Sequence, residues 1–225
     1  MTELEVSRRE RKKEETKRRI FQEAVRLFRE RGFEATTVDE IAERADVAKG
    51  TFFNHFPRKE SILSYLSETR LEVAEASAEE LLASKRPARE KLIETYLGAA
   101  AAYAEDRELT RHVLIELLLL RFTPTMEIGA RWEQLLVSIF KQGQASGELR
   151  ADVSAEQAVD ILTSVYYALL FMWSSCPETL SLDAAATPEE RARFECARDL
   201  DVGRELRARL TLVLDGLATR PGGGS

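Results

Sequence analysis

Residues 49–59 place basic and hydrogen-bonding groups opposite a short apolar stripe. Phe52 and Phe56 are four positions apart, which on a helix puts both rings on one face. An ammonium group neutralises a phosphate, a hydroxyl donates to a phosphate or touches a thymine methyl, and an amide reads a base edge. The groups available for this chemistry are Lys49, Gly50, Thr51, Asn54, His55 and Lys59. The spacing therefore predicts a surface that contacts double-stranded DNA.

Two short helices are needed to position these groups. Residues 37–40, Thr-Val-Asp-Glu, have the form of a capping box, in which Thr37 accepts from the third helical amide and Glu40 reaches back. Asp46-Val47-Ala48 ends that first helix, and a second runs from about Gly50 to Phe56, just before Pro57. Two short helices joined by a tight turn predict a helix-turn-helix. The residues expected to face inward from the first are Val38, Ile41, Ala42 and Ala45.

The segment 32–60, GFEATTVDEIAERADVAKGTFFNHFPRKE, resembles the DNA-binding signature of the TetR family of repressors. The strong resemblance covers about the first 65 residues, and beyond them it extends only to helix number and length. It implies two sets of DNA contacts. The DNA backbone would be held by Thr37, Phe53, His55 and Lys59. The major groove would be entered by Lys49, Gly50, Thr51 and Asn54.

Three positions depart from the family pattern. Asp46 stands where the family often has Gly, and Asp is among the few residues tolerated in the left-handed region. Ala48 replaces a Ser that would cap the second helix, which forgoes about 1 kcal/mol. Phe53 stands where the family usually has Tyr, so the aromatic packing is kept but a hydroxyl that commonly bonds phosphate is lost.

The rest of the chain is predicted to be helical, because Ala, Leu, Glu and Arg dominate and no alternating strand pattern occurs. A first helix covers about 9–31, and Gly32 follows as a stop. Pro87 is expected at the first position of its helix, and Gly147 just after the end of another. The later helices are expected near 58–84, 88–104, 107–120, 125–146, 154–174 and 203–218, with a short one near 188–198.

The fold class is therefore all-α, with about nine helices in two domains. A helix-turn-helix DNA-binding domain of three helices is expected over residues 1–65. About six more helices over 66–220 are expected to form an effector-binding and dimerisation domain. The tail 221–225, Pro-Gly-Gly-Gly-Ser, is expected to be disordered.

Charge is distributed unevenly along the chain. Residues 7–31 hold eleven Lys or Arg and five Asp or Glu, whereas the net charge beyond residue 60 is −8. The basic run 8–13, Arg-Arg-Glu-Arg-Lys-Lys, either lies along DNA or is a solvated helix end, and its mixed signs leave both open. The acidic second part favours contacts with ligands and partners over contacts with DNA.

Aromatic and Met side chains gather in the second part, where facing helices can build a ligand cavity. Such residues are more often core than pocket, but the resemblance places the effector site here. Because few charges interrupt these apolar faces, a hydrophobic or aromatic effector is favoured. An acyl chain, an acyl thioester and a lipophilic drug all remain open, with His112, Glu116 and Arg121 as polar groups. The candidate effector contacts are Tyr96, Leu118, Phe122, Met126, Trp132, Tyr166 and Phe171.

The last two long helices carry apolar residues at helical spacing. These residues pack either in the interior of the chain or against a partner molecule. The resemblance implies a four-helix interface between two copies. A homodimer also suits a palindromic operator, because one short helix reads only a few base pairs. These residues are Ala158, Ile161, Leu162, Val165, Leu169, Leu206, Leu210, Val213, Leu214 and Leu217.

Several other functions find little support. The two histidines, His55 and His112, make no acid/base pair, and no nucleophile motif or glycine-rich phosphate loop occurs, so an enzyme is not expected. Cys176 and Cys196 lack metal-ligand spacing, so neither a metal nor a cofactor is expected. A charged N-terminus and the absence of an 18-residue apolar run favour a cytoplasmic protein with no membrane partner.

We therefore expect a sequence-specific transcriptional regulator, a repressor released from a palindromic operator by a hydrophobic small molecule. The alternative is a ligand-binding helical protein without DNA activity.

Overall fold

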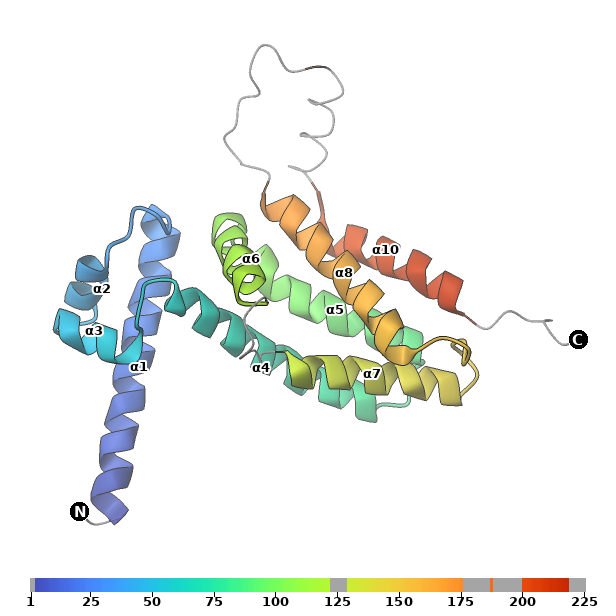
Figure 1. Cartoon of the computed structure of the whole chain (residues 1–225), viewed down its shortest axis with the longest axis horizontal. Helices are drawn as coiled ribbons and strands as arrows, with labels where there is room; N and C mark the ends of the chain where they lie inside the picture. Colours follow the sequence, from blue (N-terminus) through green and yellow to red (C-terminus); the bar gives the residue numbers. More distant parts are fainter. Residues whose placement is uncertain (1–2, 122–128, 176–186, 188–199, 219–225) are drawn as a thin grey trace, which may run out of the picture.

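The computed structural model describes residues 3–121, 129–175, 187 and 200–218. Helices α1 (Glu3–Arg31), α2 (Val38–Arg44) and α3 (Lys49–His55) form a module at one end of the molecule (Figure 1). Helix α4 (Ser61–Ala83) leads from this module into the rest of the chain. Nine helices lie within the described residues, so the predicted all-α fold is confirmed.

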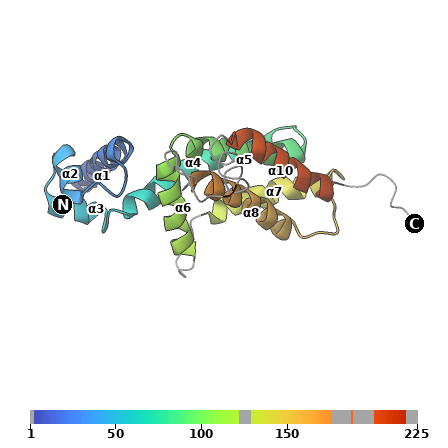
Figure 2. The same ribbon diagram turned by 90° about the horizontal axis from the view of Figure 1, so that it is seen from above.

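The second part is built around α5 (Ala88–Ala104), which packs against helices on several sides. Its neighbours include α4, α7 (Ala130–Ala145), α8 (Ala155–Ser174) and α10 (Val202–Leu217). Helix α6 (Arg107–Arg121) packs against α4 and α8. Seen from above, this bundle lies at the opposite end from α2 and α3 (Figure 2). None of the described helices combines the length and the apolar content needed to cross a membrane.

The hydrophobic core of the module includes the first turns of α4. The Tyr65 ring meets Phe21 of α1 edge-on at 5.0 Å between centroids and Phe56 at 5.8 Å. Tyr65 is half-buried, and Ile62 and Leu63 on the same turns are fully buried. Because these residues pack with the module, α4 belongs to both parts of the molecule.

Several helix ends follow the sequence prediction closely. Thr37 and Glu40 form the expected capping box at the start of α2. Gly32 ends α1 with a φ of +84°, and Gly147 has a φ of +77° after α7. Asp46 is the only described residue other than glycine with a positive φ, at +50°, as expected for the turn between α2 and α3. Ala48 begins α3 without a side-chain cap.

Some predicted helix starts differ from the structure. Helix α1 begins at Glu3 and α4 at Ser61, where the sequence predicted starts near residues 9 and 58. Of the helix predicted from 125, residues 125–128 lie outside the described residues; Gly129 adopts the left-handed conformation, and α7 begins after it at Ala130. Pro87 is the N-cap of α5, not its first helical residue. The free amides there are bound by the Glu148 carboxylate, at 2.8 Å from the Ala88 nitrogen. The expected helix near 188–198 and the tail 221–225 lie outside the described residues.

The apolar stripes of α8 and α10 mostly face the interior of a single chain. This follows from the packing of α10 against both α8 and α5. The buried members are Ala158, Leu162, Leu169, Leu206, Leu210 and Leu214. For these six residues the interior alternative holds, and assigning them to a partner surface is wrong. Ile161 differs, since it is 52% exposed.

Candidate nucleic-acid interface and effector site

The two short helices are locked together by a tight turn and a shared apolar core. The Val47 amide donates to the Ala42 carbonyl at 3.0 Å, which carries the chain from α2 into α3. Ile41 and Ala42 of α2 are buried, as is Phe52 of α3. Phe56 follows with its centroid 6.0 Å from that of Phe52, so the predicted buried stripe is confirmed. One side of α3 is thereby fixed against the module.

The opposite side of α3 is open. Gly50 and Asn54 are exposed and Thr51 is half-buried. A Cβ added at Gly50 would meet no described atom within 4 Å, so no internal packing requires glycine there. Phe53 is 43% exposed and meets Phe52 edge-on at 5.4 Å. This side therefore offers a bare backbone, a hydroxyl, an amide and a ring edge to a partner.

Lys49 is held by an acidic neighbour. Its Nζ lies 2.8 Å from Oδ1 of Asp39, on the first turn of α2, and both side chains are exposed. A surface ion pair of this kind contributes little to stability and is readily exchanged. A DNA phosphate would therefore have to compete with Asp39 for the ammonium group.

Lys59 is bound within the module. Its Nζ donates to the carbonyls of Phe33 at 2.8 Å and Thr36 at 3.0 Å, and lies 4.3 Å from the centre of the Phe33 ring. The ammonium group thus closes the loop between α1 and α2. Two of its three donors are used inside the protein, which the sequence did not suggest.

His55 and the basic half of α1 adjoin one another. Burial first, and then the nearby ammonium groups of Lys13 and Lys17, lower the pKa of His55 below its ordinary 6.5. The imidazole is therefore neutral at pH 7 and offers one donor and one acceptor. Arg8 and Lys13 of α1 are exposed, so the basic run extends the cationic surface beside α3.

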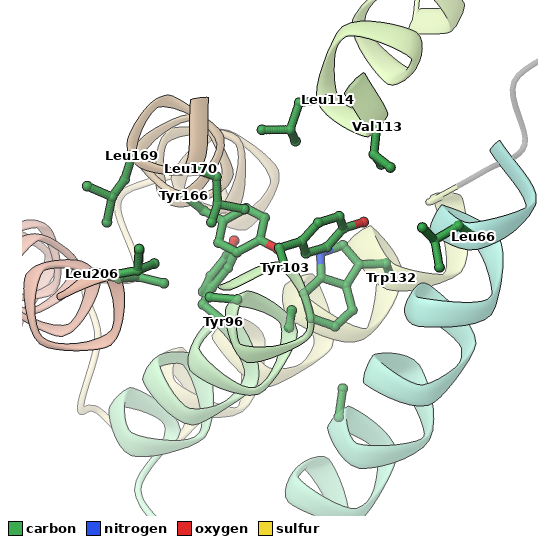
Figure 3. Close-up of a cluster of buried hydrophobic side chains, with 14 of the residues drawn as sticks. Leu66, Tyr96, Tyr103, Val113, Leu114, Trp132, Tyr166, Leu169, Leu170 and Leu206 are labelled. Atoms are coloured by element: carbon green, nitrogen blue, oxygen red, sulfur yellow. The ribbon is translucent and has the colours of Figure 1, made fainter. Parts of the chain in front are cut away.

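In the second part, three of the predicted effector contacts come together. Tyr96 packs against Trp132 at 6.1 Å and against Tyr166 at 5.6 Å between centroids, and all three are buried (Figure 3). The hydroxyl groups of Tyr96 and Thr163 are 2.8 Å apart. Burial, ahead of every other influence, raises the pKa of Tyr96. We call Tyr96, Tyr103, Trp132 and Tyr166 the aromatic cluster.

The other predicted effector contacts are not placed in this cluster. Phe171 is 44% exposed on α8. Phe122 and Met126 lie outside the described residues, and so does the side chain of Leu118, whose backbone belongs to α6. Tyr103, which was not among the predicted effector contacts, belongs to the same group of buried side chains (Figure 3), and its hydroxyl lies 3.2 Å from Oγ of buried Ser67.

Helix α6 joins the second part to the module through two polar residues. The His112 ring lies 4.7 Å from that of Phe33, and its Nδ1 is 3.9 Å from a carboxylate oxygen of Glu34. Glu116 is buried and forms an ion pair with Arg58, which follows α3. Both residues were considered as effector groups from the sequence, but they contact the module instead. We call these contacts the α6 joint.

The comparisons with known proteins agree with this geometry. Residues 20–66 match the family model described as bacterial regulatory proteins, tetR family. The transcriptional repressor KstR2 of Rhodococcus jostii is 26% identical over 203 residues, which cover 87% of this chain and 88% of that protein.

Solved structures extend the similarity to the whole fold. The TetR-family repressor FadR of Thermus thermophilus, in complex with lauroyl-CoA, has a TM-score of 0.64 and 29% identity, covering 93% of this chain and 98% of its own. FadR of Bacillus subtilis, in complex with stearoyl-CoA, has a TM-score of 0.59 at 22% identity, covering 88% and 98%. The chain therefore carries a DNA-binding segment that matches the tetR family model, on a helix order and fold that it shares with TetR-family repressors.

Proposed function

We propose that the chain is a repressor that occupies a palindromic operator as a homodimer and leaves it when a hydrophobic effector binds. The proposed DNA binding rests on the exposed side of α3. The side chains of Thr51 and Asn54 have no hydrogen-bond partner among the described residues, and Gly50 between Lys49 and Thr51 has no packing role. A helix with one side fixed and the other side polar and unused suits the major groove.

The domain organisation we propose places residues 1–65 in the DNA-binding domain and 66–220 in the regulatory domain. The packing of Tyr65 on Phe21 and Phe56 supports a boundary after it. An operator as partner implies action in the cytoplasm. No catalytic role is proposed for either domain.

For the homodimer we propose the outward faces of α8 and α10. Ile161 is 52% exposed and Leu212 is 74% exposed, although both are large and apolar. The exposed positions between them include the small residues Ser164, Ala168 and Ala208, which would let two copies approach closely. Pairing these faces would bury Ile161 and Leu212 and set the distance between the two α3 helices.

For the effector we propose a largely apolar molecule bound at the aromatic cluster. The complex of Thermus thermophilus FadR with lauroyl-CoA supports an apolar chain as one part of the ligand. The α6 joint offers a route to DNA, because α6 packs against α8 on one side while His112 and Glu116 contact the module. A ligand that is bound better when α6 is displaced would shift the module away from its DNA-binding position.

Selection of bound sequences from random DNA tests this function. We expect the selected DNA to contain a palindromic site. Thr51→Ala should lose about 1 kcal/mol or more of its preference for that site over random DNA, per half-site. The salt dependence of DNA binding by Thr51→Ala should stay unchanged. Ser138→Ala, which removes an exposed hydroxyl from α7, serves as the control. An effector should lower operator affinity by about tenfold or more, within the usual 1–3 kcal/mol of coupling. Ligand binding without any site preference would favour the alternative of a helical ligand-binding protein.

A further inference from the structure

One guanidinium group beside the aromatic cluster has an unused donor. Arg70 follows Ser67 by one turn on α4, and its guanidinium carbon lies 4.9 Å from the centre of the Tyr103 ring. Its Nη1 is buried and has no hydrogen-bond partner among the described residues. The described part of the chain places no carboxylate within ion-pair distance of Arg70.

The surroundings of Arg70 do not satisfy this donor. Burial, ahead of other influences, lowers the pKa of the guanidinium, and Arg29 acts in the same direction. Tyr103, Glu105 and Asp106 oppose the shift electrostatically. A guanidinium does not deprotonate in proteins, so the group remains a cation. The face of the Tyr103 ring attracts the positive charge of Arg70, but it offers no acceptor to the N–H groups, which point outward in the plane of the guanidinium. A buried polar group without a partner is rare and points to a missing acceptor.

The neighbours of this donor form a mixed apolar and hydroxyl setting. Ser67 and Tyr103 are both buried, and their hydroxyl groups lie 3.2 Å apart. Leu66, Val113 and Leu114 are buried members of the same hydrophobic core (Figure 3). Ser67 and Arg70 are three residues apart on α4, and the Arg70 guanidinium lies beside the Tyr103 ring, so an acceptor that reached Nη1 would be on the side of α4 that carries the two hydroxyl groups.

We propose that Arg70, with the hydroxyl groups of Ser67 and Tyr103, binds an anionic group of the effector. The effector would then be amphipathic, an apolar chain or ring that carries a carboxylate or a phosphate. A planar guanidinium fork recognises both anions, and charge-assisted hydrogen bonds are the strong ones. This inference rests on the proposed effector role of the aromatic cluster, and it narrows that role by disfavouring a wholly neutral lipophile.

The test uses three probes with one alkyl chain: dodecanoate, dodecyl phosphate and dodecanol. Binding to the full-length protein is followed by the fluorescence of Trp132 and Trp173 and by the shift in Tm. We expect at least one of the two anions to bind about tenfold or more tightly than dodecanol. Arg70→Met should remove this advantage and leave dodecanol binding unchanged, while Arg70→Lys should keep part of it.

Control variants separate recognition from folding. Arg131→Met removes an exposed guanidinium from α7 and should change none of the affinities. Tyr103→Phe removes one hydroxyl with almost no change in volume, so it should weaken anion binding severalfold even if Arg70→Met does not fold. Because the Arg70 donor is unpaired, the Tm of a folded Arg70→Met should not fall; a purely structural arginine would lower it.

The outcomes are distinct. A preference for dodecanoate or for dodecyl phosphate supports the inference and identifies the anion. Equal binding of dodecanol and both anions overturns the role of Arg70 while leaving an apolar effector in place. If none of the three probes binds, and matched phenylalkyl acids and alcohols do not bind either, both the inference and the proposed effector site are wrong.

Discussion

Replacing Lys59 by Met separates a structural from a DNA-binding role for this residue. Met keeps the apolar stem but removes the ammonium group that donates to the carbonyls of Phe33 and Thr36 at 2.8 and 3.0 Å. A hydrogen bond from a charged donor contributes about 1.5–3 kcal/mol when buried. Because Lys59 is partly exposed, each of its two hydrogen bonds contributes at the lower end of that range. Part of this contribution is kept in the variant, since water can donate to the two carbonyls in place of the ammonium group. We therefore expect Lys59→Met to lose about 2 kcal/mol of unfolding free energy.

Urea denaturation followed by circular dichroism measures this loss, with Lys49→Met as the matched control. Among the described residues Lys49 is paired with Asp39 alone, at the surface, so its replacement should leave the denaturation midpoint unchanged. DNA affinity is then measured against salt concentration for both folded variants. For each phosphate that a variant no longer neutralises, the slope should fall by about 0.9, or about 1.8 per dimer. An unchanged midpoint together with a reduced slope for Lys59→Met would refute the structural role argued here.

Three further predictions test the interface, the packing and the joint. Leu212→Glu should give a folded monomer in light scattering, and this monomer should bind the operator more weakly. Leu210→Glu should instead unfold the chain, since Leu210 is 0% exposed. A Leu212→Glu variant that remained a dimer would refute the proposed face. Gly143→Ala should cost about 1–3 kcal/mol in thermal unfolding, because its Cβ would lie 2.6 Å from Leu149 Cδ1. The control Gly98→Ala meets no described atom within 4 Å and should gain about 0.5–1 kcal/mol; equal effects of the two would contradict the close packing. Burial, and then Arg111, lower the pKa of His112 below 6.5, so the folded state favours the neutral imidazole. The stability gained in this way is complete above pH 6.5 and is lost as the pH falls through the lowered pKa of the folded state. His112→Gln should flatten the Tm against pH below 6.5, and an unaltered profile would contradict this.

The features predicted correctly from the sequence depend on residues close together in the chain. The capping box of Thr37 and Glu40 spans three positions, and the turn at Asp46 needs only a residue tolerant of positive φ. The buried stripe of Phe52 and Phe56 follows from helical periodicity alone. In each case the interaction that decides the structure lies within one or two turns.

The features that were missed depend on partners far along the chain. The acceptors of Lys59 lie 23 and 26 residues earlier, and Glu116 pairs with Arg58 across 58 positions. No local signal distinguishes such a lysine from a phosphate ligand, or such a glutamate from an effector contact. Leu210 belongs to an amphipathic stripe that has the same pattern whether it packs on α5 of its own chain or on a second copy.

The same ambiguity applies to Phe171. Periodicity assigns it to a face of α8, but which faces are covered is decided by the packing of α6, α7 and α10 around that helix. The aromatic cluster was predicted in part because Tyr96, Trp132 and Tyr166 lie on faces that the bundle does bury. The role of Tyr103 emerges only with its partner Ser67, 36 positions away.

The α6 joint limits how freely the module could be exchanged between relatives. Phe33 of the module is covered by His112, and Arg58 finds its carboxylate at Glu116. A chimera cut after residue 65 that took the rest of its chain from another regulator would uncover one face of the Phe33 ring and remove the buried partner of Arg58, leaving it only Glu60, unless that donor supplied equivalent residues on its own α6. The proposed DNA specificity of the module could therefore be transplanted only with these two matching positions, which makes the joint the region to redesign first in building a sensor from this scaffold.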